Sequence, residues 1–305
     1  MTPLQRYIAE EIATDHADGL LGRREALRRL GLLGMGAPAA VALLAACSSG
    51  GEPSSSGPTA SGSTPSGSAA PAPPGVSDAV PATAITFAGP AARTLQAAWA
   101  AAPQPRGSVL VIHENKGLTD HIRSVTGRFA GAGYSALAVD LLSELGGTAA
   151  FTDPAAATAE LGKIAPEQFI GDLQAGIAEL ERRVPGKKVG ATGFCFGGGL
   201  VWLLLAAGTA NLAAATPFYG PFPENGDLSG AKAAVLGIYA AKDERVIASR
   251  PTAEAALDRA GLTHEIYVAP NADHAFFNDT GPRYNPTAAA EAWRRVLDWY
   301  GEYLD

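Results

Sequence analysis

One pentapeptide limits the possible fold of this chain more than any other feature of its sequence. Gly193-Phe194-Cys195-Phe196-Gly197 separates a strand-like run, 188–192, from an apolar, helix-like run, 200–205. A strand that turns directly into a helix strains the backbone of the residue at the turn, and side chains on its neighbours would collide with both elements. The spacing is that of the nucleophile elbow, Gly-x-nucleophile-x-Gly, here with cysteine at its centre. The first turn of a helix favours a thiolate. A buried, inert cysteine in a glycine-rich turn is the alternative interpretation.

The first 47 residues have the pattern of a bacterial export signal. Arg23-Arg24 precedes an apolar stretch, 30–46, that ends in Leu44-Ala45-Ala46-Cys47. The arginine pair resembles a twin-arginine signal, and the tetrapeptide resembles a lipobox, whose cysteine receives lipid. The stretch is short for a membrane-spanning helix, which needs ~20 apolar residues, but it suits a signal peptide. We therefore expect export and a lipid anchor at Cys47 on the outer face of the cell membrane. An uncleaved anchor or a core helix is the alternative.

Residues 48–80 are rich in Ser, Gly, Pro and Ala and carry almost no charge. Such a segment buries too little apolar surface to offset the entropy of ordering, so we predict a disordered tether between membrane and domain. The remaining residues, 81–305, form one predicted catalytic domain. With Cys47 assigned to lipid, Cys195 is the only cysteine of that domain, and an internal disulfide is excluded.

Strand-like and helix-like runs alternate through the predicted domain. Two opening runs, 84–87 and 95–99, suggest an antiparallel pair. Further strand-like runs cover 108–113, 134–140, 188–192, 214–219, 234–239 and 264–268, and helix-like runs cover 121–132, 169–184 and 287–303. This alternation predicts an α/β fold with a mostly parallel central sheet and helices on both faces.

Two candidate partners for Cys195 come directly after strand-like runs, and in parallel sheets chemistry gathers at the carboxyl ends of strands. Asp243 follows the last strand-like run but one, and His274 follows the last. The order nucleophile, acid, histidine is that of the α/β-hydrolase triad. Asp273 adjoins His274, and sequence neighbours rarely point at one another, so the main rival acid is Glu244. The other histidines precede the elbow or begin a strand: His16, His113, His121 and His264.

This set of residues predicts nucleophilic catalysis. We expect His274 to accept the thiol proton, Asp243 to orient the imidazole, and Cys195 to attack an ester or lactone carbonyl. The backbone amide of Phe196 and that of Asn115, in the loop after the third strand, are the candidate oxyanion donors. A metal hydrolase is the rival chemistry, but the sequence has no His-x-x-x-His or Cys-x-x-Cys pair. We expect neither a metal nor another cofactor.

Five motifs together resemble the dienelactone hydrolase family, from about residue 84 to the end of the chain. They cover 111–118, 138–141, 193–198, 241–243 and 273–277, and residues 283–285 and 290–295 also fit. The resemblance implies an α/β-hydrolase fold, carboxymethylenebutenolidase-like activity and a Cys195–His274–Asp243 triad. It also implies that Glu114 contacts the resting thiol and accepts its proton when substrate displaces the carboxylate. The structural alternative is that Glu114 bridges Lys116 or Arg123.

The chain departs from that family in its expected substrate contacts. Members that cleave dienelactone hold the substrate carboxylate with arginines, one of them shortly after the catalytic histidine. Residues 276–279 contain no arginine here, and neither does the loop 141–145. Arg283 is the candidate substitute. We therefore expect a small ester or lactone as substrate and leave dienelactone itself open.

The net charge of the chain limits its possible binding partners. The net charge of −7 argues against nucleic acid. The expected partners are a small ester or lactone and, through Cys47, the membrane; the oligomeric state stays open, a monomer included. Two other functions compete: an envelope ligand-binding lipoprotein that keeps an inactive hydrolase fold, and a thiol redox sensor.

Overall fold

The computed structural model describes residues 1–48 and 72–305, and the chain divides into two compact units, Met1–Pro71 and Ala72–Asp305. Three helices that contact one another form the described part of the first unit: α1 (Pro3–Ala17), α2 (Arg23–Leu32) and α3 (Ala37–Ser48). A capping box begins α1, because the Thr2 hydroxyl accepts from the Gln5 amide and the Gln5 side chain accepts from the Thr2 amide.

The apolar stretch 30–46 does not form one continuous helix. The chain leaves α2 after Leu32, passes through Gly34 in a left-handed conformation (φ 85°), and enters α3 at Ala37. Cys47 lies in the last turn of α3. Within the described ranges, no helix is both long enough and apolar enough to cross a membrane. Most of the predicted tether, residues 49–71, lies outside the described residues.

The second unit begins before the predicted domain boundary. The Val80 amide donates to the Gly127 carbonyl oxygen at 3.0 Å, and a Cβ on Gly131 would lie 2.1 Å from the Asp78 carbonyl oxygen. The segment around residues 78–80 therefore lies directly on α4 (Asp120–Gly131). Backbone packing on glycine needs no apolar side chain, which is why composition alone placed this segment in the tether.

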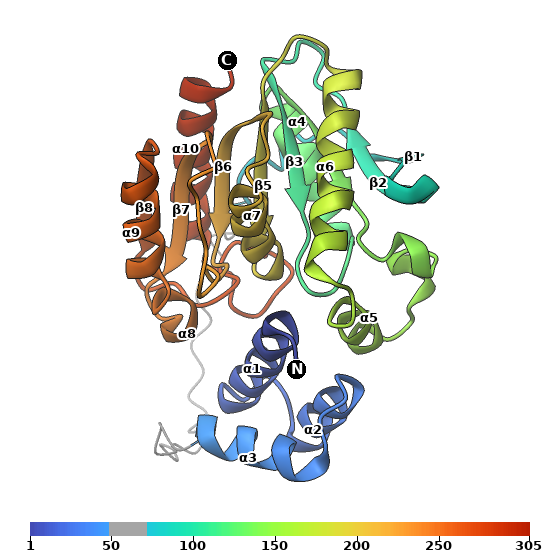
Figure 1. Ribbon diagram of the computed structural model, residues 1–305, viewed down its shortest axis with the longest axis vertical. Helices are drawn as coiled ribbons and strands as arrows, with labels where there is room; N and C mark the ends of the chain where they lie inside the picture. Colours follow the sequence, from blue (N-terminus) through green and yellow to red (C-terminus); the bar gives the residue numbers. More distant parts are fainter. Residues whose placement is uncertain (49–71) are drawn as a thin grey trace, which may run out of the picture. The chain divides into compact units, whose positions relative to one another are not determined.

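An eight-stranded sheet forms the centre of the second unit, in the order β1-β2-β4-β3-β5-β6-β7-β8 (Figure 1). β1 pairs antiparallel with β2, and β2 pairs antiparallel with β4, whereas all other neighbours are parallel. The strands are β1 (Thr83–Ala88), β2 (Thr94–Ala100), β3 (Gly107–Ile112), β4 (Tyr134–Val139), β5 (Val189–Phe194), β6 (Leu212–Phe218), β7 (Ala234–Ala240) and β8 (His264–Ala269). The predicted mostly parallel sheet is confirmed.

Helices cover both faces of this sheet (Figure 1). α4 packs on one face together with α10 (Pro286–Tyr303), where the rings of Phe129 and Trp293 lie 4.7 Å apart. α6 (Pro166–Arg183) and α7 (Phe196–Ala206) contact each other and the strands from the other face. Because both faces are covered, every residue of β3, β4, β5 and β7 is buried.

The remaining segments are short. They are the 3-10 turns η1 (Pro90–Ala92), η2 (Ser143–Leu145) and η3 (Thr148–Ala150) and the helices α5 (Pro154–Leu161), α8 (Glu244–Ile247) and α9 (Arg250–Ala260).

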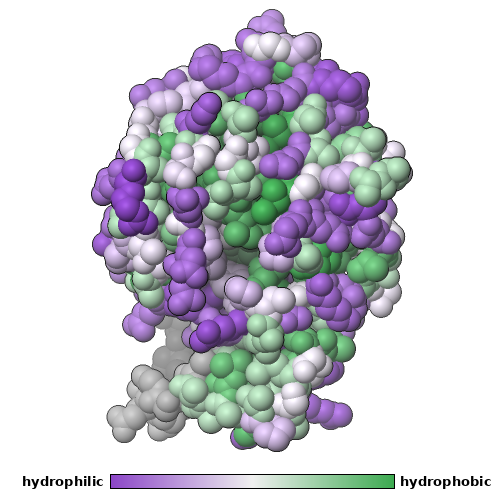
Figure 2. Space-filling model, in the orientation of Figure 1, coloured by the Kyte–Doolittle hydropathy of each residue, from purple (hydrophilic) through white to green (hydrophobic). Residues whose placement is uncertain are grey.

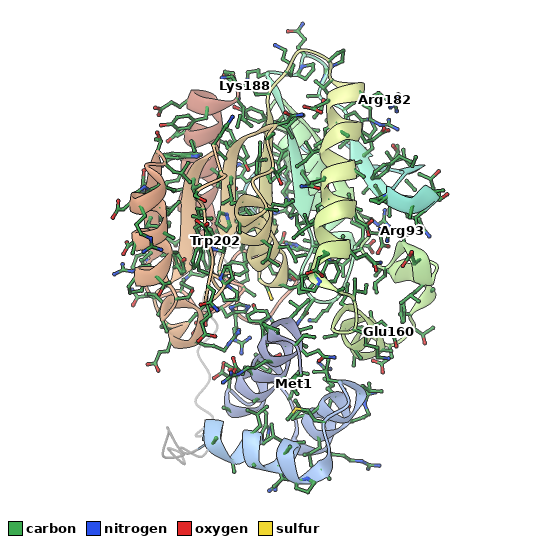
Figure 3. All side chains as sticks on the ribbon, in the orientation of Figure 1. Met1, Arg93, Glu160, Arg182, Lys188 and Trp202 are labelled. Atoms are coloured by element: carbon green, nitrogen blue, oxygen red, sulfur yellow. The ribbon has the colours of Figure 1, made fainter. Side chains whose placement is uncertain are left out.

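Two side chains labelled in Figure 3 mark the amino and carboxyl ends of the parallel strands. Lys188 precedes β5 and marks the amino ends of the parallel strands, whereas Glu160, in α5, lies at their carboxyl ends. At the antiparallel side, Arg93 pairs with Asp172 of α6 at 2.5 Å, which attaches the β1–β2 hairpin to that helix.

The helix that follows the elbow, α7, is apolar on all sides, as expected of a helix buried between layers. Its Trp202 is fully buried, and its ring packs edge-on against Phe222 at 5.1 Å. The central, apolar band on the face of the second unit in Figure 2 lies over this helix.

Candidate active site

Cys195 occupies the sharp turn between β5 and α7. Its backbone has φ 57° and ψ −118°, a strained conformation for a residue with a side chain. The turn is tight because a Cβ on Gly193 would lie 2.2 Å from the Gly197 carbonyl oxygen. A Cβ on Gly197 would lie 2.4 Å from the Ile112 carbonyl oxygen. Only glycine fits at either position, so the pentapeptide has the geometry that its spacing predicts.

His274 lies beside this turn, held by an acid from the neighbouring strand. The His274 Nδ1–H donates to Asp243 Oδ2 at 2.5 Å, and both side chains are buried. Cys195 Sγ lies within 4.8 Å of a ring nitrogen of His274. Burial by itself would raise the pKa of Asp243, but the electrostatic interaction and hydrogen bond with His274, the charge of Arg245 and the Val246 amide outweigh it and lower that pKa. An ionised Asp243 favours the His274 tautomer whose Nε2 can accept a proton.

The two rival acids lie elsewhere. Glu244 is exposed on the first turn of α8, and Asp273 is about half exposed and 3.6 Å from Lys242 Nζ. Asp243 also caps α8, because its Oδ1 accepts from the Val246 amide at 3.2 Å. Of the three acids, Asp243 is the one bonded to His274.

The two candidate oxyanion donors come from adjacent segments. Phe196 is the first residue of α7, where a helix leaves its amides without an intrahelical acceptor. Asn115 lies in the loop after β3, whose end packs on α7 at Gly197. In the part of the chain that the structure describes, neither amide donates a hydrogen bond. Neither amide is therefore committed to an acceptor in the described part of the protein.

Glu114 belongs to the same cluster. Its Oε2 accepts from Asn278 Nδ2 at 2.7 Å, and its Oε1 is buried without a hydrogen-bond partner among the described residues. Burial raises the pKa of Tyr219, and the nearby charges of Glu114 and Cys195 raise it further. Glu114 and Cys195 therefore both act electrostatically on the Tyr219 hydroxyl. The structural alternative was a bridge from Glu114 to Lys116 or Arg123. Among the described residues Glu114 forms an ion pair with neither, and the Asn278 amide is its hydrogen-bond donor.

Sequence analysis missed Tyr219 and Asn278. Tyr219 directly follows β6 and has a strained backbone (φ 34°). Its ring packs edge-on against His274, with centroids 5.2 Å apart. The rule that selected Asp243 and His274, a position at the carboxyl end of a strand, also selects Tyr219. No comparable signal marks Asn278.

A buried ionic cluster anchors the segment that follows His274. Asp279 accepts from His121 Nδ1 at 2.6 Å and from Arg128 Nη2 at 2.6 Å, and both partners are on α4. The side chains of His121 and Arg128 are each 2% exposed. Asp279 thus attaches the loop that follows His274 to α4. Its neighbour in that loop, Asn278, is the residue that contacts Glu114.

Arg283 lies further along the same loop, before α10, and is partly exposed. Its predicted role in holding substrate stays a prediction.

Comparison with known proteins identifies the family of the chain. Residues 94–304 match the dienelactone hydrolase family. The chain belongs to the dienelactone hydrolase family. A candidate carboxymethylenebutenolidase from Methylorubrum extorquens is 32% identical over 216 residues, which cover 65% of this chain and 73% of that protein. A relative of the same name from Escherichia coli strain K12 is 33% identical over 213 residues, covering 65% of this chain and 78% of its own length.

Solved structures of dienelactone hydrolase relatives agree with this assignment. A candidate dienelactone hydrolase from Klebsiella pneumoniae has a TM-score of 0.63 at 32% identity and covers 73% of this chain and 99% of its own. A dienelactone hydrolase-like promiscuous phosphotriesterase from metagenomic libraries has a TM-score of 0.65 at 26% identity and covers 74% and 100%. The second unit therefore has the α/β-hydrolase fold, as predicted, and the family makes the protein a hydrolase.

Proposed function

We propose that this protein hydrolyses small carboxylic esters or lactones with Cys195 as nucleophile, His274 as base and Asp243 as orienting acid. The observation that carries the proposal is the pairing of a strained Cys195 at the elbow with an imidazole that Asp243 holds at 2.5 Å. Strain at a nucleophile and a base oriented by a third group are typical of covalent catalysis.

The proposed reaction has two steps. Cys195 Sγ attacks the carbonyl carbon while His274 Nε2 takes the thiol proton, and the amides of Phe196 and Asn115 donate to the oxygen that becomes negative. The carbon–oxygen bond to the leaving group then breaks, His274 returns the proton to that oxygen, and a thioester remains. In the second step a water attacks the thioester, His274 takes its proton and returns it to sulfur, and the acid is released.

Glu114 has a role in the first step of this scheme. Its partnerless Oε1 supports the idea that, when substrate displaces the carboxylate, Glu114 accepts the thiol proton and passes it to His274 Nε2. Asn278 would hold the carboxylate in place through its other oxygen.

The same two residues support a preference for uncharged substrates. Glu114 is a buried carboxylate, and the amide beside it, Asn278, is neutral. A substrate carboxylate brought next to Glu114 would meet a like charge that the neutral Asn278 amide does not offset, which disfavours binding. We therefore propose neutral esters and lactones as the substrate class, in preference to a lactone that carries a carboxylate.

Replacement of Cys195 tests the proposal. The full-length protein should hydrolyse p-nitrophenyl acetate and a neutral lactone faster than a carboxylate-bearing dienelactone or a phosphotriester. Cys195→Ala should lower kcat about 10⁴-fold or more, the usual cost of removing a nucleophile. Mass spectrometry of acid-quenched wild type should show an acylated peptide that contains Cys195. Ester hydrolysis that survives Cys195→Ala would exclude this mechanism.

We also propose that the protein is exported and held on the outer face of the cell membrane by lipid on Cys47. The support is the sequence pattern alone, an arginine pair followed by an apolar stretch and Leu44-Ala45-Ala46-Cys47. Expressed in a bacterium with twin-arginine export and lipoprotein processing, the wild type should sediment with membranes, and Cys47→Ala should move it to a soluble fraction. The matched control is Cys195→Ala, which should stay with the membranes. A Cys47→Ala protein that still sediments with membranes would contradict lipid anchoring.

A further inference from the structure

His113 is the residue just before the oxyanion loop, and its ring is fully buried. Its Nδ1 lies 2.6 Å from the Glu114 carbonyl oxygen, and its Nε2 lies 3.2 Å from the Leu141 amide nitrogen. A carbonyl oxygen accepts and an amide donates, so the ring carries its proton on Nδ1 and accepts at Nε2. Burial lowers the pKa of His113, against the opposing effect of Asp140, so the neutral ring is favoured.

This hydrogen bond determines the orientation of one peptide group. The Glu114–Asn115 peptide is trans, as are all the described peptide bonds. In a planar trans peptide the carbonyl and the N–H point in opposite directions. The bond from His113 to the Glu114 carbonyl therefore also fixes the direction of the Asn115 N–H, the second candidate oxyanion donor.

Neighbouring contacts hold the rest of the loop. The Thr158 hydroxyl donates to the Asn115 carbonyl oxygen at 2.8 Å, and the Leu118 amide donates to the Thr148 hydroxyl at 2.7 Å. Thr148 is in turn bonded to Asp140, at the end of β4. Hydrogen bonds from α5 and, through Thr148, from the end of β4 thus hold the loop at Asn115 and Leu118. The bond from His113 holds it at the Glu114 carbonyl.

The ring of His113 also touches the other oxyanion residue. It stacks on the Phe196 ring with centroids 6.3 Å apart and planes 11° from parallel. One buried side chain therefore contacts the residue that carries the first amide and bonds to the peptide that carries the second.

We propose that His113 is a positioning residue for the oxyanion hole, which aims the Asn115 amide by bonding to the Glu114 carbonyl. This inference rests on the proposed ester hydrolysis. The orientation of the amide matters most in the transition state, when charge develops on the substrate oxygen. Replacing His113 should therefore change kcat and leave substrate binding in the ground state nearly unchanged.

Three variants of the full-length protein separate the two hydrogen bonds of the ring. His113→Asn places an amide donor where Nδ1 was and lacks the acceptor for Leu141. His113→Gln reaches towards Leu141 but has no donor at the position of Nδ1. His113→Leu has neither. Loss of one oxyanion donor typically costs about 10²–10³ in kcat, so misdirecting it should lower kcat about 10–100-fold in the Gln and Leu variants. The Asn variant should stay within about threefold of wild type, and KM should change little in all three.

A transition-state mimic provides a second readout. Cys195 Sγ adds to the carbonyl carbon of a trifluoromethyl ketone while His274 takes the thiol proton, which gives an adduct with a negative oxygen. Its inhibition constant should therefore rise in the Gln and Leu variants by the same factor as kcat falls. Melting temperatures should be recorded alongside, since all three variants lose packing. If kcat follows melting temperature, or if Asn is as impaired as Leu, His113 is only structural and the inference is wrong. If the wild type shows no Cys195-dependent hydrolysis, the proposed function fails instead.

Discussion

Asp243→Asn should lower kcat for ester hydrolysis about 10⁴-fold, the cost of holding a catalytic histidine in the wrong tautomer. An asparagine amide can donate to His274 Nδ1, which leaves the proton on Nε2, the atom that must accept the proton of Cys195. The fold should be retained. Asp243 also caps α8 through Val246, and asparagine is an equally good capping residue. Steady-state kinetics together with circular dichroism would check both statements.

The matched control is Glu244→Gln, which removes the neighbouring acid from the same loop. Glu244 is exposed, so this variant should keep nearly full activity. If Glu244→Gln is the variant that loses activity, or if Asp243→Asn stays within tenfold of wild type, Asp243 does not orient His274.

Asp279→Ala should be the most destabilising single replacement among the ion pairs of the second unit. Asp279 is the shared acceptor of His121 and Arg128, and the Arg128 side chain is 2% exposed. Removing one partner of a buried ion pair leaves an uncompensated charge and costs about 3–5 kcal/mol. Because Asn278 holds Glu114, activity should fall as well at temperatures where the protein remains folded. Urea denaturation would measure the free energy of unfolding.

The same cluster predicts an acid limit to stability. Burial alone would raise the pKa of Asp279, but hydrogen bonds and charges from His121 and Arg128 lower it to about 2, from an ordinary value of 3.8. A folded-state pKa below the unfolded one stabilises the protein above the unfolded value, and this stabilisation is lost as pH falls from about 4 towards 2. The Asp279→Ala variant should lose less stability over that interval than the wild type does.

Glu291 supplies the control for this cluster. Arg294 and Arg295 also lower its pKa to about 2, but this group lies on the surface of α10 with a third of its side chain exposed. Surface ion pairs contribute little, so Glu291→Gln should be much less destabilising than Asp279→Ala. Equal losses for the two variants would mean that burial of the Asp279 cluster is not what makes it important.

The amino-acid sequence determined the order of elements and the residues that follow each strand. Continuous apolar runs marked the buried strands, and the position after a strand selected Asp243 and His274. These signals are local, since they depend on the spacing of a few neighbouring residues. The helices α5 and α9 were not predicted. They are short and rich in alanine, so their sequences show no clear alternation of apolar and polar faces.

Only the tertiary structure decided which distant residues meet. Asn278 lies 164 positions after Glu114, and Asp279 lies 151 positions after Arg128. Whether such side chains touch depends on the strand order and on the path of each loop, which no local pattern encodes. His113 shows the same division: the sequence places it at the end of a strand, but its hydrogen bond to Leu141 exists because β3 and β4 are neighbours in the folded sheet.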